Sequence, residues 1–231
     1  MFQFYSGVWS GRHNKFSMPA SAAHDMRQPV LALDLYAGWL AKDPTASTET
    51  VPKITASTKA VITLFDSLFD MSRLTEGQIS TNLEAVNLNE LMSALYMQYQ
   101  PIAVSKNLTL RTRAIQATVF TDYILLERIL DNLLNNAIKY TTSGCVLLAC
   151  KNSARGVKIE VWDTGIGISS EQHSLVFKEF HKSPSNSGTT DGFGLGLAIV
   201  SQLADLIGAE LRLKSRLGQG TAVSVQLGQV I

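Results

Sequence analysis

Residues 127–141 read ERILDNLLNNAIKYT and fall in a long helix that the sequence predicts from about Thr121 to Tyr140. Asn132, Asn136 and Lys139 recur at spacings of four and three, so their side chains share one face of this helix. Amides and an ammonium on one face can bind Mg²⁺ and phosphate. A merely polar face is the usual alternative for an Asn-rich surface helix, so the neighbouring motifs must decide between the two.

The next motif, EVWDTGIGI at residues 160–168, ends a predicted strand in Asp163 and turns through Gly165 and Gly167. An aspartate at a strand end can accept the exocyclic amine of adenine, while glycines let the backbone close tightly over the ring. A bare Asp-x-Gly-x-Gly pattern is weak support for a nucleotide site. It gains weight here because it follows the polar helix face.

A second glycine motif, GFGLGLAIV at residues 192–200, leads Gly192, Gly194 and Gly196 into a helix predicted from Leu195 to Ile207. Backbone amides and the dipole at a helix N-terminus attract phosphate. The motif differs from the dinucleotide-binding fingerprint, which needs a preceding strand and a Gly-x-Gly-x-x-Gly spacing. Walker-type and Ser/Thr/Tyr protein-kinase signatures are also missing from the sequence.

Helices and strands alternate around these motifs. Apolar–polar alternation and short apolar runs predict strands, and a further helix is expected near Asn89 to Val104. Helices gathered against a mostly antiparallel sheet make a two-layer α+β domain. The predicted strands are LTLRTRA (residues 108–114), Val146–Cys150, Val157–Trp162, Leu211–Ser215 and Ala222–Leu227.

The N-terminal third has a purely helical pattern, from Phe16 to about Leu74. Apolar residues recur at spacings of three and four in two segments, separated by the polar connection KDPTASTET at residues 42–50. So short a connection makes the two helices antiparallel neighbours. Because two helices enclose too little core, we expect a second copy of the chain to complete a homodimeric four-helix bundle.

The first of these helices contains AAHDMRQPVLAL, residues 22–33, which places His24 beside Asp25 and one turn before Gln28. A histidine on a bundle helix is usually an ordinary surface residue. Pro29 argues for a function, because a proline inside a helix removes a hydrogen bond and costs about 3 kcal/mol. The carboxylate of Asp25 can hold the imidazole in one tautomer, so that the other ring nitrogen becomes more nucleophilic.

The composition excludes several classes of protein. The chain has 231 residues, and 20 Lys and Arg nearly balance 19 Asp and Glu, which argues against nucleic acid as a partner. Cys145 and Cys150 lie in an apolar run and are interpreted as small core residues. Since no apolar run approaches the roughly 18 residues of a membrane span and no secretory signal opens the chain, we expect a cytoplasmic fragment without direct membrane contact, even if the full-length protein is membrane-anchored.

Taken in order, these motifs resemble the five boxes of bacterial-type sensor histidine kinases. Residues 24–30, with FSMPASAAH (residues 16–24) as lead-in, resemble the phospho-acceptor box in the His-Asp-Leu-Arg-Gln-Pro form of hybrid sensor kinases. The polar helix face, DTGIGI, VFKEFHK (residues 176–182) and GFGLGLAIV resemble the N, G1, F and G2 boxes of the ATP-binding domain. That domain is shared in outline with gyrase, Hsp90-type and MutL-type ATPases, the GHKL group. The resemblance runs from Phe16 to Leu227.

The resemblance implies a division of the chain and a fold. Residues 1–15 are an N-terminal remnant or linker, residues 16–76 form the dimerisation and phospho-acceptor hairpin, and residues 77–231 form the ATP-binding domain. The expected fold is therefore an α-helical hairpin, part of a dimeric four-helix bundle, followed by a two-layer α+β ATP-binding sandwich of the histidine-kinase/GHKL type.

By the same resemblance, ATP phosphorylates His24, Asp25 orients or accepts the other ring proton, and Gln28 stands where the family positions water for dephosphorylating its partner. ATP and Mg²⁺ are the implied cofactors, with Asn136 as the metal ligand. Asn132 occupies the position of the catalytic glutamate of hydrolysing relatives, where an amide cannot act as a general base. The other implied nucleotide-binding residues are Lys139, Tyr140, Asp163, Gly165, Gly167, Phe180, Gly192, Gly194, Leu195 and Gly196.

The implied partners are a second copy through the hairpin, a response-regulator receiver domain that accepts the phosphoryl group, and an upstream sensor domain outside this chain. Two other functions stay open. A hydrolytic ATPase related to gyrase or MutL is disfavoured by Asn132 and the His24 box, and a nucleotide-binding scaffold would work by dimerisation alone. The predicted mobile lid, Ser183 to Asp191, holds no Arg or Lys, so slow turnover is expected unless Lys178 and Lys182 supply the positive charge.

Overall fold

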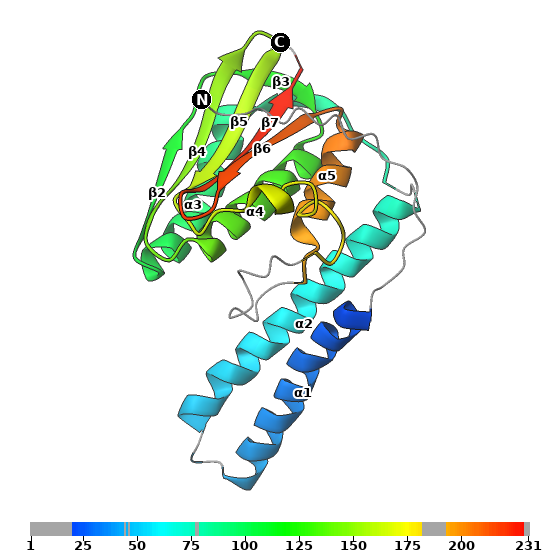
Figure 1. The fold of residues 1–231 in the computed structure, drawn as a ribbon, viewed down its shortest axis with the longest axis vertical. Helices are drawn as coiled ribbons and strands as arrows, with labels where there is room; N and C mark the ends of the chain where they lie inside the picture. Colours follow the sequence, from blue (N-terminus) through cyan, green and yellow to red (C-terminus); the bar gives the residue numbers. More distant parts are fainter. Residues whose placement is uncertain (1–19, 44, 46, 77–78, 182–192, 229–231) are drawn as a thin grey trace.

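The computed structural model describes residues 20–228, apart from positions 44, 46, 77–78 and 182–192. The predicted N-terminal remnant, residues 1–15, lies outside the described residues. An elongated helical hairpin forms one end of the molecule and an α/β body forms the other (Figure 1). The hairpin consists of α1 (Ala20–Lys42) and α2 (Ser47–Thr75), which pack along each other. This confirms the predicted hairpin, with Pro29 inside α1.

The body contains a five-stranded sheet in the order β2-β4-β5-β7-β6. The pair β2–β4 is parallel and the other three pairs are antiparallel, so the mostly antiparallel sheet is confirmed. The strands are β2 (Leu108–Arg113), β4 (Gly144–Ser153), β5 (Gly156–Asp163), β6 (Glu210–Arg216) and β7 (Gly220–Leu227), and the helices are α3 (Leu88–Ser105), α4 (Tyr123–Tyr140) and α5 (Gly196–Leu206).

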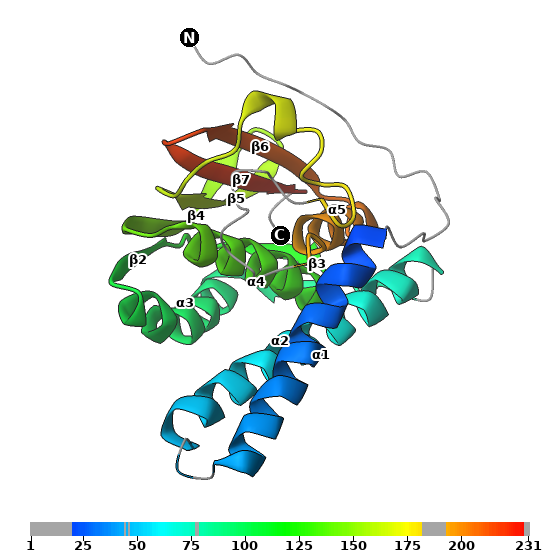
Figure 2. The ribbon, with the colours of Figure 1, turned by 60° about the horizontal axis from the view of Figure 1, so that its bottom comes forward.

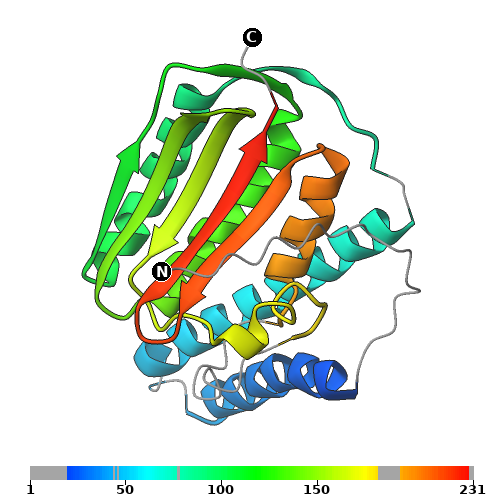
Figure 3. The same cartoon turned by 45° about the horizontal axis from the view of Figure 1, so that its top comes forward.

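One face of this sheet carries the core of the body. Figure 3 shows the sheet in front of α3, α4 and α5, which together form the second layer. Inward residues alternate along each strand, and Leu148 of β4 and Ile159 of β5 are almost completely buried against the helices. The two-layer α+β sandwich is therefore confirmed. Cys150 is buried in this core, whereas Cys145, on the opposite face of β4, is half-buried.

A second, two-stranded sheet was not predicted. The strands β1 (Glu84–Asn87) and β3 (Thr118–Thr121) pair antiparallel, and β3 ends where the long helix was expected to begin. Helix α4 begins two residues later, because Asp122 caps its N-terminus and accepts a hydrogen bond from Leu125 N at 2.9 Å. The other carboxylate oxygen of Asp122 accepts from Asn82 N at 2.8 Å, which anchors the segment that leads into β1.

The hairpin is joined to the body by side-chain contacts as well as by the continuous polypeptide backbone. Met71, near the end of α2, has no exposed surface and belongs to the same hydrophobic core as α4 and the sheet. Asp70 forms an ion pair with Arg128 of α4, and α2 also packs against α5 (Figure 2). The last turns of α2 are therefore built into the body. No helix in the described part of the chain is long and apolar enough to cross a membrane.

We expect the Met71→Ala variant to lose about 2–5 kcal/mol of stability, because it removes a side chain from a closed core. Urea unfolding followed by circular dichroism measures the loss. Met97 provides the matched control, since its side chain is 72% exposed on α3, and Met97→Ala should change stability by about 0.5 kcal/mol or less. Equal losses in the two variants would show that Met71 is not part of the core.

Candidate nucleotide-binding site

Helix α4 presents its predicted polar face at the edge of the core. Its apolar face is buried, whereas Asn132, Asn136 and Lys139 are half-buried. The amide nitrogen of Asn132 donates to the carbonyl oxygen of Arg128 at 2.9 Å, one turn back along the helix. This hydrogen bond fixes the amide and leaves its oxygen, Oδ1, directed at the neighbouring helix.

The N-terminus of α5 meets this polar face. A Cβ atom added at Gly196 would lie 3.2 Å from Oδ1 of Asn132 and 3.5 Å from Nδ2 of Asn136. A side chain here would press on the amide of Asn132, whereas its distance to the amide of Asn136 is that of an ordinary van der Waals contact. Leu195, directly before the helix, is buried and anchors the turn in the core. The structure therefore brings the polar helix face and the second glycine motif together, as the sequence predicted.

Asp163 lies at the end of β5, with only 8% of its surface exposed. Its Oδ1 accepts hydrogen bonds from Gly165 N at 2.8 Å and Thr221 N at 3.3 Å. Burial raises the pKa of Asp163, although these two backbone donors act in the opposite direction. Since both described hydrogen bonds fall on Oδ1, the second oxygen, Oδ2, remains to accept a hydrogen bond from a ligand.

The turn after Asp163 is held against the end of α4. The carbonyl oxygen of Tyr140 accepts from Ile166 N at 3.2 Å, and a Cβ at Gly165 would lie 2.3 Å from that same oxygen. Gly167 has a positive φ of 68°, and its Cβ would lie 2.0 Å from the carbonyl oxygen of Arg216. Gly165 is thus required by a backbone contact that places Asp163 beside α4, and Gly167 by a backbone contact with the end of β6.

Lys139 and Tyr140 lie side by side at the end of α4. The Lys139 Nζ is 4.7 Å from the centroid of the Tyr140 ring, within the range of a cation–π interaction. The Tyr140 ring therefore holds the Lys139 ammonium at the end of α4 where the turn after Asp163 also lies.

The predicted motif VFKEFHK, residues 176–182, contacts the second glycine motif. Phe180 packs against the hydrophobic core and has a positive φ of 59°. Gly194 approaches it closely, because a Cβ there would lie 2.7 Å from the carbonyl carbon of Phe180 and 2.6 Å from the carbonyl oxygen of His181. The segment before the lid and the segment after it are therefore in contact.

Some predicted residues fall elsewhere. His24 and Asp25 belong to α1, but their side chains lie outside the described residues. Lys182, Gly192 and the whole predicted lid, Ser183 to Asp191, also lie outside them. Gln28 is exposed on α1. Lys178, which was considered as a source of positive charge for the lid, is exposed on the segment before it.

Sequence reasoning missed Thr221 and Gly220. Thr221 acts through its backbone N–H, which every residue except proline carries, so the residue type gives no signal. Gly220 has a φ of 96°, and its Cβ would lie 2.0 Å from the carbonyl oxygen of Asp163. The run GQGT at residues 218–221 was the available signal, since closely spaced glycines mark a turn.

The side chains at this site suit a metal ion that arrives bound to a nucleotide. Among the described residues, no group of three or more His, Cys, Asp or Glu side chains could hold a metal ion. The half-buried amide of Asn136 supplies one oxygen, and Mg²⁺ commonly takes one or two protein oxygens, with phosphates and water completing its shell. The site therefore fits a nucleotide-bound Mg²⁺ better than a resident metal.

Comparisons with known proteins agree with this geometry. Residues 121–230 match the family described as histidine kinase-, DNA gyrase B-, and HSP90-like ATPase. The autoinducer 2 sensor kinase/phosphatase LuxQ of Vibrio parahaemolyticus is 30% identical over 90% of this chain and 26% of its own length. The histidine protein kinase SaeS of Staphylococcus epidermidis is 30% identical over 94% of this chain and 64% of its own length. The chain thus spans about a quarter of LuxQ and under two thirds of SaeS.

Solved structures share the fold. The histidine kinase AdeS of Acinetobacter baumannii matches with a TM-score of 0.68 at 18% identity, over 88% of this chain and 98% of that one. Full-length ShkA in complex with AMPPNP matches with a TM-score of 0.65 at 26% identity, over 92% of this chain and 47% of that one. Residues 121–230 therefore match the histidine kinase-, DNA gyrase B- and HSP90-like ATPase family, and hairpin and body together resemble the catalytic core of sensor histidine kinases.

Proposed function

We propose that this chain is the catalytic core of a sensor histidine kinase of a two-component system. It transfers the γ-phosphoryl group of ATP to His24 and passes it on to an aspartate of a response-regulator receiver domain. The observation that carries this proposal is the meeting of Asn132 and Asn136 with Gly196, because it combines a phosphate-binding helix N-terminus with amides in place of a carboxylate. The likeness to ShkA, whose structure was solved with AMPPNP, supports ATP as the nucleotide.

The proposed nucleotide lies between α4, α5 and the turn after β5. Asp163 accepts the adenine amine through Oδ2, Tyr140 stacks near the ring, and the α5 N-terminus at Gly196 binds phosphate. Lys139 contacts phosphate, and Asn136 holds Mg²⁺, which supplies charge neutralisation on the phosphates when bound.

The proposed reaction is an in-line displacement at the γ-phosphorus. A ring nitrogen of His24 forms the new N–P bond, the bond to the ADP oxygen breaks, and the other ring proton is oriented or taken up by Asp25. The amide of Asn132 has no basic group that could accept a proton from water, so Asn132 does not promote hydrolysis of ATP. ATP is therefore preserved from hydrolysis until His24 reaches it.

The hairpin supports dimerisation. Large apolar side chains stay exposed along α1 and α2 although these helices already pack on each other. Such a surface favours burial against a second copy in a four-helix bundle. The exposed residues are Leu31, Leu35, Trp39, Ile62, Phe65 and Phe69.

Two observations concern the partner that receives the phosphoryl group and its possible dephosphorylation. The ThkA structure that resembles this chain was solved in complex with the response regulator TrrA, which supports a receiver domain as partner and hence a cytoplasmic reaction. The LuxQ relatives are named sensor kinase/phosphatase, and exposed Gln28 is suited to position water for removal of phosphate from the receiver. We therefore propose a kinase that also has phosphatase activity.

Incubation with γ-labelled ATP tests the kinase reaction. We expect the chain to acquire label that is acid-labile and base-stable, as a phosphoramidate is. The His24→Gln variant should lose this label completely, because it lacks the accepting nitrogen, whereas the matched variant His13→Gln should retain it. Free phosphate without labelled protein would instead indicate a hydrolytic ATPase, and neither product would indicate a nucleotide-binding scaffold.

Replacement of Asp163 by Asn tests the adenine contact. The Asn oxygen can still accept from Gly165 N and Thr221 N, but an NH₂ group then faces the adenine amine. We expect ATP binding to weaken by at least about tenfold, measured by calorimetry. Asp205 on α5 offers the control, since burial raises its pKa as well, and Asp205→Asn should leave ATP affinity unchanged. Similar losses in both variants would contradict the proposed role.

The raised pKa of Asp163 also predicts a pH dependence of stability. Because burial disfavours the charged carboxylate, the folded protein holds this proton more tightly than the unfolded chain does. Its contribution to stability therefore decreases as the pH rises from about 4, the ordinary aspartate pKa, through the raised native value. The Asp163→Asn variant has no such proton to lose. Urea unfolding across this range should show a stability difference that shifts in favour of the variant as pH rises, and parallel profiles would refute this.

A further inference from the structure

The second face of the five-stranded sheet points away from α3, α4 and α5, and no described helix covers it (Figure 3). We call this surface the open face. Strand register aligns its outward side chains in cross-strand rows, because residues paired across strands point to the same side. Seven basic residues of the strands lie on this face: Arg111, Arg113, Lys151, Lys158, Arg212, Lys214 and Arg216. They are joined by Arg155 from the β4–β5 turn.

The charge of the open face differs from that of the rest of the chain. Its eight basic side chains face only two carboxylates, Glu160 and Glu210, which leaves an excess of six positive charges. The whole chain has a formal net charge of +1, so everything else together carries five more negative than positive charges. A balanced composition therefore conceals a strongly polarised molecule.

The two carboxylates hold the cations in place without neutralising them. Glu160 contacts the ammonium groups of Lys151 and Lys158, each at 2.7 Å. Glu210 contacts Arg212 at 2.8 Å and Arg155 at 3.2 Å. Each carboxylate is thus shared by two cations, and each group of three keeps one positive charge with unused N–H donors.

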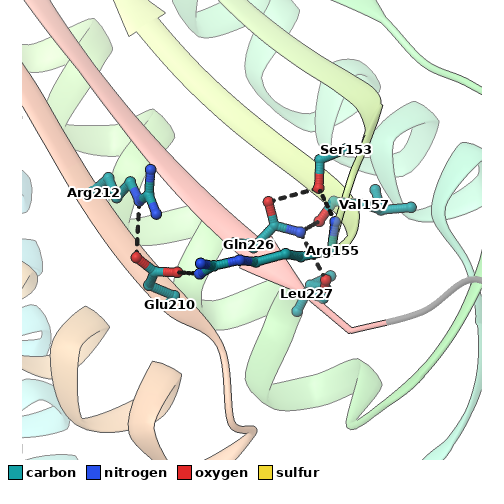
Figure 4. Close-up of polar contacts among 7 residues, drawn as sticks. All are labelled: Ser153, Arg155, Val157, Glu210, Arg212, Gln226 and Leu227. Carbon is teal, nitrogen blue, oxygen red and sulfur yellow. Dashed lines mark hydrogen bonds and ion pairs between the residues drawn. The ribbon is translucent and has the colours of Figure 1, made fainter. Parts of the chain in front are cut away.

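Figure 4 shows how one of these groups is built. The Arg155 side chain reaches along Gln226 to Glu210, and Gln226 is itself held by Ser153 and by the carbonyl oxygens of Val157 and Leu227. The hydrogen bonds order the side chains before any partner arrives. Ordered cations lose less conformational entropy when they bind.

An exposed tryptophan lies near the middle of the open face. Trp162 on the central strand β5 is 47% exposed, and its cross-strand neighbours on the two sides are Leu147 and Ala222. The same row ends in Arg111 on β2 and Lys214 on β6. An aromatic centre within a charged rim is the usual anatomy of a protein interface, in which Trp and Arg dominate the binding energy.

We propose that the open face is a docking surface for a protein with an acidic surface, with Trp162 as the central contact. The charge excess selects an anionic partner. The two embedded carboxylates and the single exposed tryptophan of the open face favour a protein over nucleic acid, which binds to uninterrupted basic grooves with several stacking rings. The surface lies on the side of the sheet opposite to Asn132 and Gly196, so binding there leaves the nucleotide site accessible.

A direct test uses the full chain and a fluorescein-labelled Glu- and Asp-rich peptide with one central Tyr, followed by fluorescence anisotropy. The double variant Arg111→Glu/Arg113→Glu replaces two exposed cations on the edge strand β2. We expect it to bind the peptide about tenfold more weakly or worse. The matched control Lys42→Glu/Lys59→Glu makes the same charge change at exposed positions on the hairpin and should bind like the wild type. Trp162→Ser should also weaken binding without a change of net charge.

Other results would overturn the proposal. Equal weakening in the two charge-reversal variants would show that net charge alone attracts the peptide. Absence of peptide binding by the wild type would also overturn it, as would preferred binding to an oligothymidine of similar length or to phosphatidylserine vesicles. Circular dichroism and ATP binding check that each variant is folded. Because labelling of His24 is measured separately, failure of this proposal is distinguishable from failure of the kinase assignment.

Discussion

The carbonyl oxygen at the end of α4 organises the body. A helix leaves its last carbonyl groups without partners inside the helix, and Tyr140 finds one in the amide of Ile166. The turn after β5 must therefore come close to α4, which Gly165 permits because it has no Cβ. The same turn carries Asp163, so this backbone contact adds to the packed core between the helix layer and the sheet layer and helps to position the buried carboxylate.

The polar residues of the site follow from this arrangement. Asn132 is fixed by its own helix, and Asn136 lies one turn further along the same face, so both amides are presented to α5 without a loop of their own. Rigid placement matters because a phosphoryl transfer enzyme gains most of its rate from positioning and electrostatics rather than from covalent chemistry. The proposed phosphoryl acceptor, His24, in contrast belongs to a separate element, α1 of the hairpin.

Much of this could be predicted from the sequence, for physical reasons that differ between elements. The face of Asn132, Asn136 and Lys139 was predictable because helical spacing alone determines which side chains align. The short strands β1 and β3 were not, since four residues with one buried position in β1 and two in β3 carry little periodicity. Thr221 could not be predicted for a different reason, because its contact with Asp163 uses only its backbone N–H. The junction at Met71 was also missed, because a helix pattern does not reveal which protein surface a residue contacts.

That junction constrains how the molecule can move. Met71 lies inside the core and Asp70 pairs with Arg128, so the final turns of α2 are fixed to the body. Any bending between hairpin and body must therefore occur on the N-terminal side of Asp70. Any displacement of these turns of α2 would therefore first meet Arg128 of α4 and the surface of α5, the two helices that border the candidate nucleotide site. The hairpin is thus connected to that site by packed side chains and not by the peptide backbone alone.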